Sequence, residues 1–195
     1  MELNESYWST RYKQGQTGWD IGHVSTPIKE YVDQLQNKEL SVLIPGAGNA
    51  YEAEYLWQNG FKNVTVVDLS KDPLNNLRER FPMIDPSKLI HGDFFDLDQT
   101  FDLVIEQTFF CALSPALRTA YVKKMSEVLN PEGKLVGLLF NIPLFDDHPP
   151  FGGHRSDYLP LFEERFEISV IETAYNSIPQ RAGNELFINM SLSKI

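Results

Sequence analysis

The sequence predicts an α/β protein built on a doubly wound, mostly parallel, seven-stranded Rossmann-like sheet with an antiparallel hairpin at one edge. Short apolar runs rich in β-branched residues alternate with helical patterns along residues 41–141. Two further strand-like runs, residues 166–173 and 185–192, enclose a turn-rich segment, which is typical of an antiparallel hairpin. Because 195 residues fit one domain with a sizeable core, we expect residues 1–195 to form a single domain.

The expected elements follow one another without an internal repeat or a domain linker. The carboxyl ends of parallel strands meet at one edge of such a sheet, and ligands bind there. By residue number, the expected elements are a helix opened by Pro27, a strand over 41–44, a helix over 51–59, a strand over 64–70, a helix over 73–81, a strand with its exit loop over 89–95, a strand over 101–107, a helix over 115–129, a turn over 130–133 and a strand over 135–141.

Residues 1–38 precede the first strand and carry a cluster of aromatic side chains in a polar segment loosened by glycines. Trp8, Tyr12 and Trp19 belong to this cluster. One interpretation is that the segment packs onto the core. The other is that it forms an N-terminal helical lid, since an arm hinged at glycines can close over a ligand and exclude water.

The composition limits the classes of partner. Acidic residues outnumber basic residues by 27 to 17, giving a net charge of −10, which argues against nucleic acid or an anionic membrane as a main partner. The single cysteine, Cys111, fits a reducing compartment, and the N-terminus lacks the features of a signal peptide. We therefore expect a cytoplasmic monomer that acts on a small molecule. Cys111 itself is interpreted either as a nucleophile or as a core residue.

Acidic and glycine residues at three strand ends predict an adenosine-containing cofactor. Gly46 and Gly48 follow the first strand, and Asp68 comes 20 residues after Gly48, where a ribose-binding carboxylate is found in dinucleotide-type βαβ units. Asp93 and Phe94 follow the third strand and are suited to an adenine amino group and ring. The alternatives are a helix cap for Asp68 and an ordinary loop residue for Asp93.

The first turn also separates two kinds of cofactor. Tyr51 stands where a nicotinamide-binding turn usually has its third glycine, and Glu52 places a negative charge at the helix start. These residues disfavour a pyrophosphate but not a cofactor with a cationic centre and an amino acid tail. S-adenosylmethionine has that character, and a nicotinamide-dependent reductase remains the less favoured alternative.

The long segment 142–154 raises the question of a metal site. It contains Asp146, Asp147, His148 and His154, but their spacing matches no tetrahedral set and no cysteine joins them. We therefore expect no metal.

Several motifs resemble the thiopurine S-methyltransferase family, and most closely its branch of thiol and halide methyltransferases. The resemblance covers nearly the whole chain in order. Its motifs are Tyr7-Trp8, Arg11-Tyr12-Lys13-Gln14-Gly15, Thr17-Gly18-Trp19-Asp20, Ile44-Pro45-Gly46-Ala47-Gly48, Phe101-Asp102-Leu103-Val104, Phe109-Phe110-Cys111-Ala112-Leu113 and His148-Pro149-Pro150-Phe151.

The resemblance implies a class I fold and methyl transfer from S-adenosylmethionine to a small thiol, halide or chalcogen acceptor by in-line displacement. It implies a lid over cofactor and substrate that includes Trp8, Tyr12 and Trp19. For the cofactor it implies that Gly46 and Gly48 contact the methionine part, that Asp68 contacts the ribose, and that Asp93 and Phe94 contact the adenine. The acceptor pocket that it implies is formed by Gln107, Pro150, Arg181 and Trp19, with Gln107 also next to the cofactor.

The acceptor stays open because the chain departs from the family there. Gln107 replaces the arginine of thiopurine enzymes and the tyrosine of the halide branch. We assign no general base, since a thiolate or halide is already a nucleophile. A module that binds the cofactor without turnover is the second hypothesis.

Overall fold

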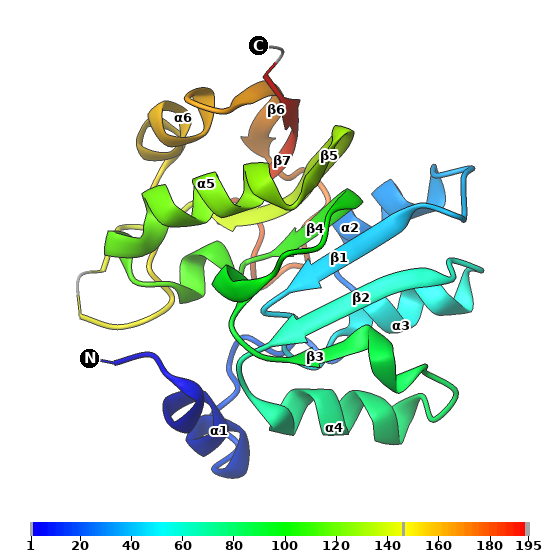
Figure 1. Ribbon diagram of the computed structural model, residues 1–195. Coiled ribbons are helices and arrows are strands. Elements are labelled where there is room, and N and C mark those ends of the chain that lie inside the picture. The colour runs from blue at the N-terminus through cyan, green and yellow to red at the C-terminus, as the bar shows by residue number, and fades with distance from the viewer. Residues whose placement is uncertain (1, 146, 194–195) are drawn as a thin grey trace.

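The computed structural model describes residues 2–145 and 147–193 as one seven-stranded sheet with helices on both faces (Figure 1). No helix within these residues is long and apolar enough to cross a membrane. The elements are α1 (Glu5–Lys13), α2 (Thr26–Asp33), β1 (Ser41–Pro45), α3 (Tyr51–Gln58), β2 (Asn63–Asp68), α4 (Lys71–Arg80), η1 (Pro86–Lys88), β3 (Leu89–His91), η2 (Phe94–Asp96), β4 (Phe101–Gln107), η3 (Phe110–Ala112), η4 (Pro115–Leu117), α5 (Arg118–Glu127), β5 (Leu129–Phe140), α6 (Arg155–Glu163), β6 (Phe166–Thr173) and β7 (Glu185–Leu192).

The strand order β3-β2-β1-β4-β5-β7-β6 confirms the doubly wound sheet with an antiparallel edge. Strands β1 to β5 pair in parallel, and β7 lies antiparallel between β5 and β6. In Figure 1, β1 and β2 point toward α1 and the loop that follows β5. The carboxyl ends of the parallel strands and these two segments therefore face the same region.

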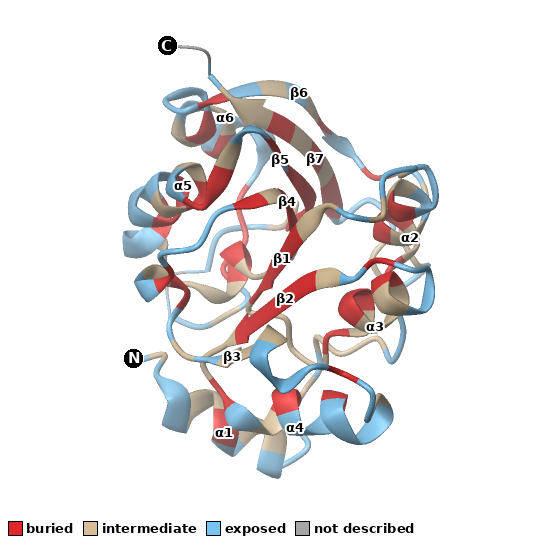
Figure 2. Ribbon diagram, turned by 45° about the vertical axis from the view of Figure 1, so that its right-hand side comes forward, coloured by how far each residue is buried: buried red, intermediate tan, exposed pale blue. Residues whose placement is uncertain are grey.

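The central strands are buried on both faces, which explains their nearly continuous apolar sequence (Figure 2). In β1, Val42 and Ile44 pack on one face with apolar residues of α2, α3 and α4. The intervening Leu43 packs on the other face with residues of α5 and α6. This alternation places helices on both faces and leaves the ends of the strands open for a site.

One predicted turn is wrong. Residues 130–133 lie inside β5, where the register with β4 shifts. Leu129 pairs with Phe101, but the next pair is Lys134 with Leu103, so β5 carries extra residues between the two pairs. A Cβ on Gly133 would lie only 2.9 Å from the Asn130 carbonyl oxygen, so glycine permits this tight irregularity. The turn-forming residues thus interrupt the ladder without ending the strand.

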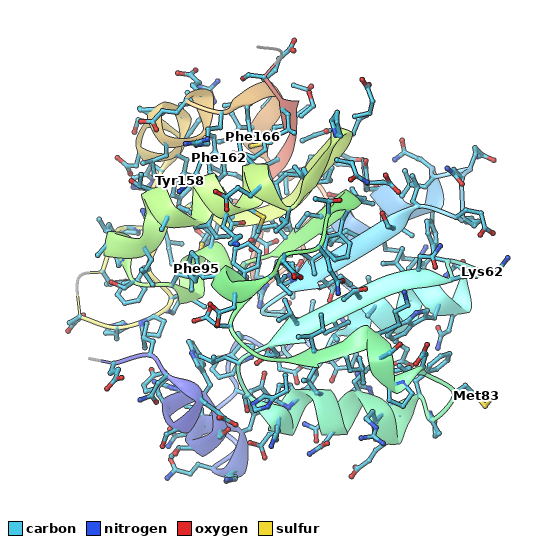
Figure 3. The ribbon with its side chains drawn as sticks, in the orientation of Figure 1. Lys62, Met83, Phe95, Tyr158, Phe162 and Phe166 are labelled. Carbon is cyan, nitrogen blue, oxygen red and sulfur yellow. The ribbon has the colours of Figure 1, made fainter. Side chains whose placement is uncertain are left out.

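The helix α6 was not predicted, because Pro160 lies within it and its pattern is only weakly amphipathic. His154 begins the helix with a capping box in which its backbone N–H donates to Oδ2 of Asp157 at 2.7 Å. Tyr158 and Phe162 are buried and pack against Phe110, and Phe162 also packs against Phe166. Figure 3 shows Tyr158 and Phe162 of α6 close to Phe166 of β6.

Candidate active site

A cavity of about 820 Å³ opens at the carboxyl ends of the parallel strands. This volume lies within the usual range for small-molecule and cofactor sites. Residues from the N-terminal arm, from four strand ends, from the loop after β5 and from the loop before β7 meet there. The cavity lining includes every residue that the sequence predicts for the site, namely Trp8, Tyr12, Trp19, Gly46, Gly48, Asp68, Asp93, Phe94, Gln107, Pro150 and Arg181.

The turn after β1 needs both of its glycines. Gly46 and Gly48 have positive φ angles of 53° and 54°. A Cβ on Gly46 would lie 1.9 Å from the Phe109 ring, so this glycine makes room for an aromatic side chain at the cavity wall. A Cβ on Gly48 would lie 3.4 Å from the Tyr12 hydroxyl and 3.8 Å from Nε1 of Trp19. The N-terminal aromatic residues therefore cover the turn.

Asp68 joins this turn to the end of β2. Its Oδ2 accepts the Gly48 N–H at 3.2 Å, and its Oδ1 accepts the Ser70 N–H at 2.8 Å. Burial raises the pKa of the Asp68 carboxyl to about 6. The cap of α4 is Ser70, whose hydroxyl accepts the Asp72 N–H, so Asp68 is not the helix cap that the alternative interpretation required. Each carboxylate oxygen retains acceptor capacity toward the cavity.

Asp93 and Phe94 differ in how far they reach the cavity. Asp93 is exposed, and its Oδ1 accepts the Phe95 N–H at 3.0 Å. Phe94 is only 3% exposed, with edge-to-face contacts to Phe95 and Phe109. Phe95, which sequence reasoning missed, is less buried and lines the same cavity. The larger aromatic surface at this end therefore belongs to Phe95.

The N-terminal arm packs on the fold and also forms part of the cavity wall. Trp19 makes edge-to-face contacts with Trp8 at 5.6 Å and with Tyr12 at 5.7 Å between ring centroids. The Ser9 and Ser70 hydroxyls lie 2.8 Å apart and tie α1 to the start of α4. Burial and then the Asp68 carboxylate raise the pKa of Tyr12 above its ordinary value, which keeps its hydroxyl protonated.

Gln107 is the last residue of β4, and Arg181 lies in the loop before β7. The Ser25 hydroxyl donates to Oε1 of Gln107 at 2.8 Å. Arg181 donates from Nη1 to the buried Glu185 carboxylate at 3.1 Å and from Nη2 to the Trp19 carbonyl oxygen at 2.6 Å. Its guanidinium also lies over the Phe140 ring at 5.3 Å. Arg181 therefore connects the loop before β7 to the aromatic arm.

Glu52 does not act as the sequence suggested. It is 5% exposed and lies outside the cavity lining, and its Oε1 accepts the Ser25 N–H at 3.1 Å. Burial raises the pKa of this carboxyl. Its charge therefore does not select against a pyrophosphate at the turn. Glu52 instead fixes the chain before α2.

A buried polar cluster supports the wall behind Gln107. The carboxylate of Glu106 accepts the Phe110 N–H at 3.1 Å and the Tyr121 hydroxyl, and burial raises its pKa to about 7. Cys111 is fully buried, and desolvation raises the pKa of its thiol to about 12. Cys111 is therefore a core residue, and its interpretation as a nucleophile is wrong.

The histidine residues after β5 serve local structure. Asp146 lies outside the described residues. His154 begins α6, and Nδ1 of His148 lies 3.2 Å from its neighbouring carbonyl at Pro149. Within residues 2–145 and 147–193, no group of three or more His, Cys, Asp or Glu side chains could hold a metal ion.

Sequence reasoning missed part of the cavity wall. Leu69 follows Asp68 and Thr108 follows Gln107, so strand ends alone could have indicated them. The remaining missed residues are mostly apolar and come from distant segments that only tertiary packing brings together. They include Arg11, Phe109, Leu113, Leu117 and Phe140.

The sheet, the cavity at its carboxyl edge and the acid after β2 define a class I methyltransferase that uses S-adenosylmethionine. In overall structure the chain is similar to 1,6-didemethyltoxoflavin-N1-methyltransferase of Burkholderia thailandensis, solved with S-adenosylhomocysteine bound. The TM-score is 0.76 with 17% identity, and the match covers 98% of this chain and 87% of the other.

Within that class, the chain belongs to the thiopurine S-methyltransferase family, whose model matches residues 3–189. It is 27% identical over 194 residues to probable thiol methyltransferase 2 of Arabidopsis thaliana, covering 95% of this chain and 84% of the relative. It is 29% identical over 189 residues to thiocyanate methyltransferase 1 of Brassica oleracea, covering 94% and 83%. The family membership confirms the resemblance and the expected methyl donor, and it excludes the nicotinamide-dependent reductase.

Proposed function

We propose that this enzyme transfers the methyl group of S-adenosylmethionine to a small sulfur nucleophile held beside Gln107 and Arg181. The observation that carries this proposal is one continuous cavity that contains both halves of such a site, one for the methyl donor and one for the acceptor. Asp68, Gly48 and Asp93 line its donor half, and Gln107 and Arg181 line its acceptor half.

The donor half fits S-adenosylmethionine. Asp68 has acceptor capacity for the ribose hydroxyls, and exposed Asp93 has a carboxylate for the adenine amino group. The turn at Gly46 and Gly48 is suited to the methionine part. The two carboxylates at strand ends also favour a cofactor with a positively charged sulfonium. We assign to Phe95 the side chain that packs against the adenine ring, and Phe94 supports Phe95 by its edge-to-face contact.

S-adenosylmethionine supplies an activated methyl group on its sulfonium. The residues of this chain then need only to place the acceptor in line with that group and to exclude water. Trp8, Tyr12 and Trp19 act as the cover that excludes water from the donor half. Because a thiolate is already a strong nucleophile, we assign no general base.

The acceptor half fits a small anion with an apolar or polarisable body. Arg181 supplies a positive charge, and Gln107 supplies amide donors. Phe109, Phe140 and Pro150 line the same cavity and provide an apolar wall. Thiolates and thiocyanate match this combination, and thiol and thiocyanate methyltransferases are the named relatives. Halide and other chalcogen nucleophiles are the nearest variants.

We further propose that residues 1–195 work as one domain with residues 1–38 as the lid, in a cytoplasmic monomer. The Arg181 bond to the Trp19 carbonyl oxygen supports a lid that closes against the rest of the same chain. Size-exclusion chromatography with light scattering tests the monomer, for which we expect a mass near 22.4 kDa. A stable dimer would contradict it.

The acceptor is tested with the purified enzyme, S-adenosylmethionine and a panel of an alkyl thiol, an aromatic thiol, bisulfide, thiocyanate and iodide. Methylated products are identified by mass spectrometry, and kcat/KM is compared across the panel. We expect the highest kcat/KM for a sulfur nucleophile. Higher kcat/KM for iodide than for every sulfur nucleophile would overturn the proposed acceptor class. Arg181→Lys should retain more activity than Arg181→Gln, whereas Arg165→Gln, at an exposed position, serves as the matched control.

A further inference from the structure

We infer that Ser25 is a positioning residue that orients the side-chain amide of Gln107 toward the acceptor. Glu52 holds Ser25 in place, and the hydroxyl of Ser25 engages the amide oxygen of Gln107. The N–H donors of Gln107 are then left for the cavity. This inference rests on the proposed function, because it assigns a role to residues that surround the proposed acceptor.

The use of the Ser25 hydroxyl is unusual for its place in the chain. Ser25 is the N-cap residue of α2, and a serine there ordinarily accepts an amide N–H of its own helix. The Ser25 side chain makes no such bond. Its hydroxyl donates instead to Oε1 of Gln107 at 2.8 Å, across 82 positions in the sequence. The hydroxyl therefore serves the cavity wall rather than the helix.

Ser25 is held from the side of α3. Ser25 is only 3% exposed, and its N–H donates to Oε1 of Glu52 at 3.1 Å. This bond fixes the backbone of Ser25, and the Ser25 side chain also lies beside the same carboxylate. The charge of Arg181 lies close enough to lower the pKa of Glu52, opposing the larger effect of burial. Glu52, Ser25 and Gln107 thus form a chain from α3 to the cavity.

The orientation of Gln107 has a chemical consequence. The terminal torsion of a glutamine is broad and roughly two-fold, so an unrestrained amide can present either its oxygen or its nitrogen. An oxygen directed at an anionic acceptor would repel it, whereas the N–H groups attract it. In the structure the Ser25 hydroxyl donates to the amide oxygen, so the oxygen is engaged by Ser25 and the N–H groups are left for the cavity. Ser25 therefore favours anionic acceptors without touching them.

The test compares Ser25→Ala with Ser25→Thr, which retains a hydroxyl, and with Ser156→Ala at an exposed serine outside the cavity lining as the control. Five quantities are measured: calorimetric affinity for S-adenosylhomocysteine, affinity for thiocyanate in its presence, KM and kcat for the best sulfur acceptor, and the midpoint of thermal unfolding. For Ser25→Ala we expect thiocyanate affinity to fall and acceptor KM to rise by about tenfold, the size of one lost hydrogen bond to a charged group. Affinity for S-adenosylhomocysteine should stay within about twofold, and Ser25→Thr should restore most of the loss.

A double-mutant cycle then asks whether Ser25 acts through Gln107. Once Gln107→Ala has removed the amide, adding Ser25→Ala should cause no further loss of thiocyanate affinity. Full additivity in the cycle would overturn the inference. So would a Ser25→Ala enzyme whose only change is a lower thermal midpoint, because that is the result of a purely structural role. If the wild-type enzyme methylates no sulfur nucleophile, the proposed function fails. If it does so and Ser25→Ala behaves like wild type, only this inference fails.

Discussion

The carboxylate of Asp68 accepts the amide N–H of Gly48 at 3.2 Å, which joins the ends of the two neighbouring strands β1 and β2. The glycine turn and the acid are therefore one structural unit. In this unit the backbone N–H groups of Gly48 and Ser70 donate to the carboxylate, and Asp68 also lines the cavity. The donor half of the cavity is built on this arrangement.

Replacing Asp68 by Ala should weaken binding of S-adenosylhomocysteine by about 1–3 kcal/mol, because the ribose hydroxyls lose their acceptor. Isothermal titration calorimetry measures the effect. Asp98→Ala removes an exposed carboxylate outside the cavity lining and should leave the affinity unchanged. Equal affinities of Asp68→Ala and wild type would remove Asp68 from the cofactor site.

The same residue predicts a pH dependence of cofactor binding. The Asp68 pKa of about 6 means that its carboxyl is ionised at neutral pH and becomes protonated as the pH falls through that value. Since ribose hydroxyls donate to the ionised form, affinity should be constant above pH 7 and fall by up to about tenfold per pH unit well below 6. In Asp68→Asn the affinity should be lower and should lack this inflection. A wild-type affinity that rises on acidification would contradict the assignment.

Glu106 predicts a pH dependence of folding stability. Burial raises its pKa from 4.5 to about 7, so the folded state binds this proton more tightly than the unfolded chain does. Glu106 therefore adds about 3 kcal/mol to the free energy of unfolding below pH 4.5, and this contribution is lost as the pH rises to 7. Asp68 acts in the same direction between 3.8 and about 6.

Urea unfolding at several pH values tests this prediction in Glu106→Gln, whose amide oxygen can still accept the Phe110 N–H. We expect the fall in the free energy of unfolding between pH 5 and pH 8 to be markedly smaller than in wild type. Glu132→Gln, at an exposed position, should retain the wild-type slope. An identical slope in Glu106→Gln and wild type would show that this carboxyl titrates normally.

The donor half could be predicted from the sequence because its signals are local. Asp68 and Gly48 belong to one βαβ unit, so a fixed spacing of 20 residues brings them together. Ser25 could not be predicted, because its pattern is that of an ordinary N-cap and its partner lies 82 residues away. Likewise, Glu52 at a helix start indicates a charge near the turn, and only packing reveals that it turns toward Ser25 instead.

The aromatic lid predicts a fluorescence signal. Trp8 and Trp19 line the cavity, whereas Trp57 stacks on Phe81 elsewhere. Binding of S-adenosylhomocysteine should therefore change the emission of the first two tryptophans. The change should persist in Trp57→Phe and be greatly reduced in Trp19→Phe, as titrations of each variant would show. If Trp57→Phe alone abolishes the change, the arm does not cover the cofactor.

The proposed function joins a methyl donor to a sulfur acceptor in this one cavity. Its most direct test is to incubate the enzyme with an aromatic thiol and S-adenosylmethionine that carries a trideuterated methyl group, and to quantify both products by mass spectrometry. We predict trideuteromethyl thioether and S-adenosylhomocysteine in equal amounts, with both reduced about 5- to 150-fold in Asp68→Ala at limiting cofactor. Formation of S-adenosylhomocysteine without any labelled thioether, or no turnover although S-adenosylhomocysteine binds, would contradict the claim.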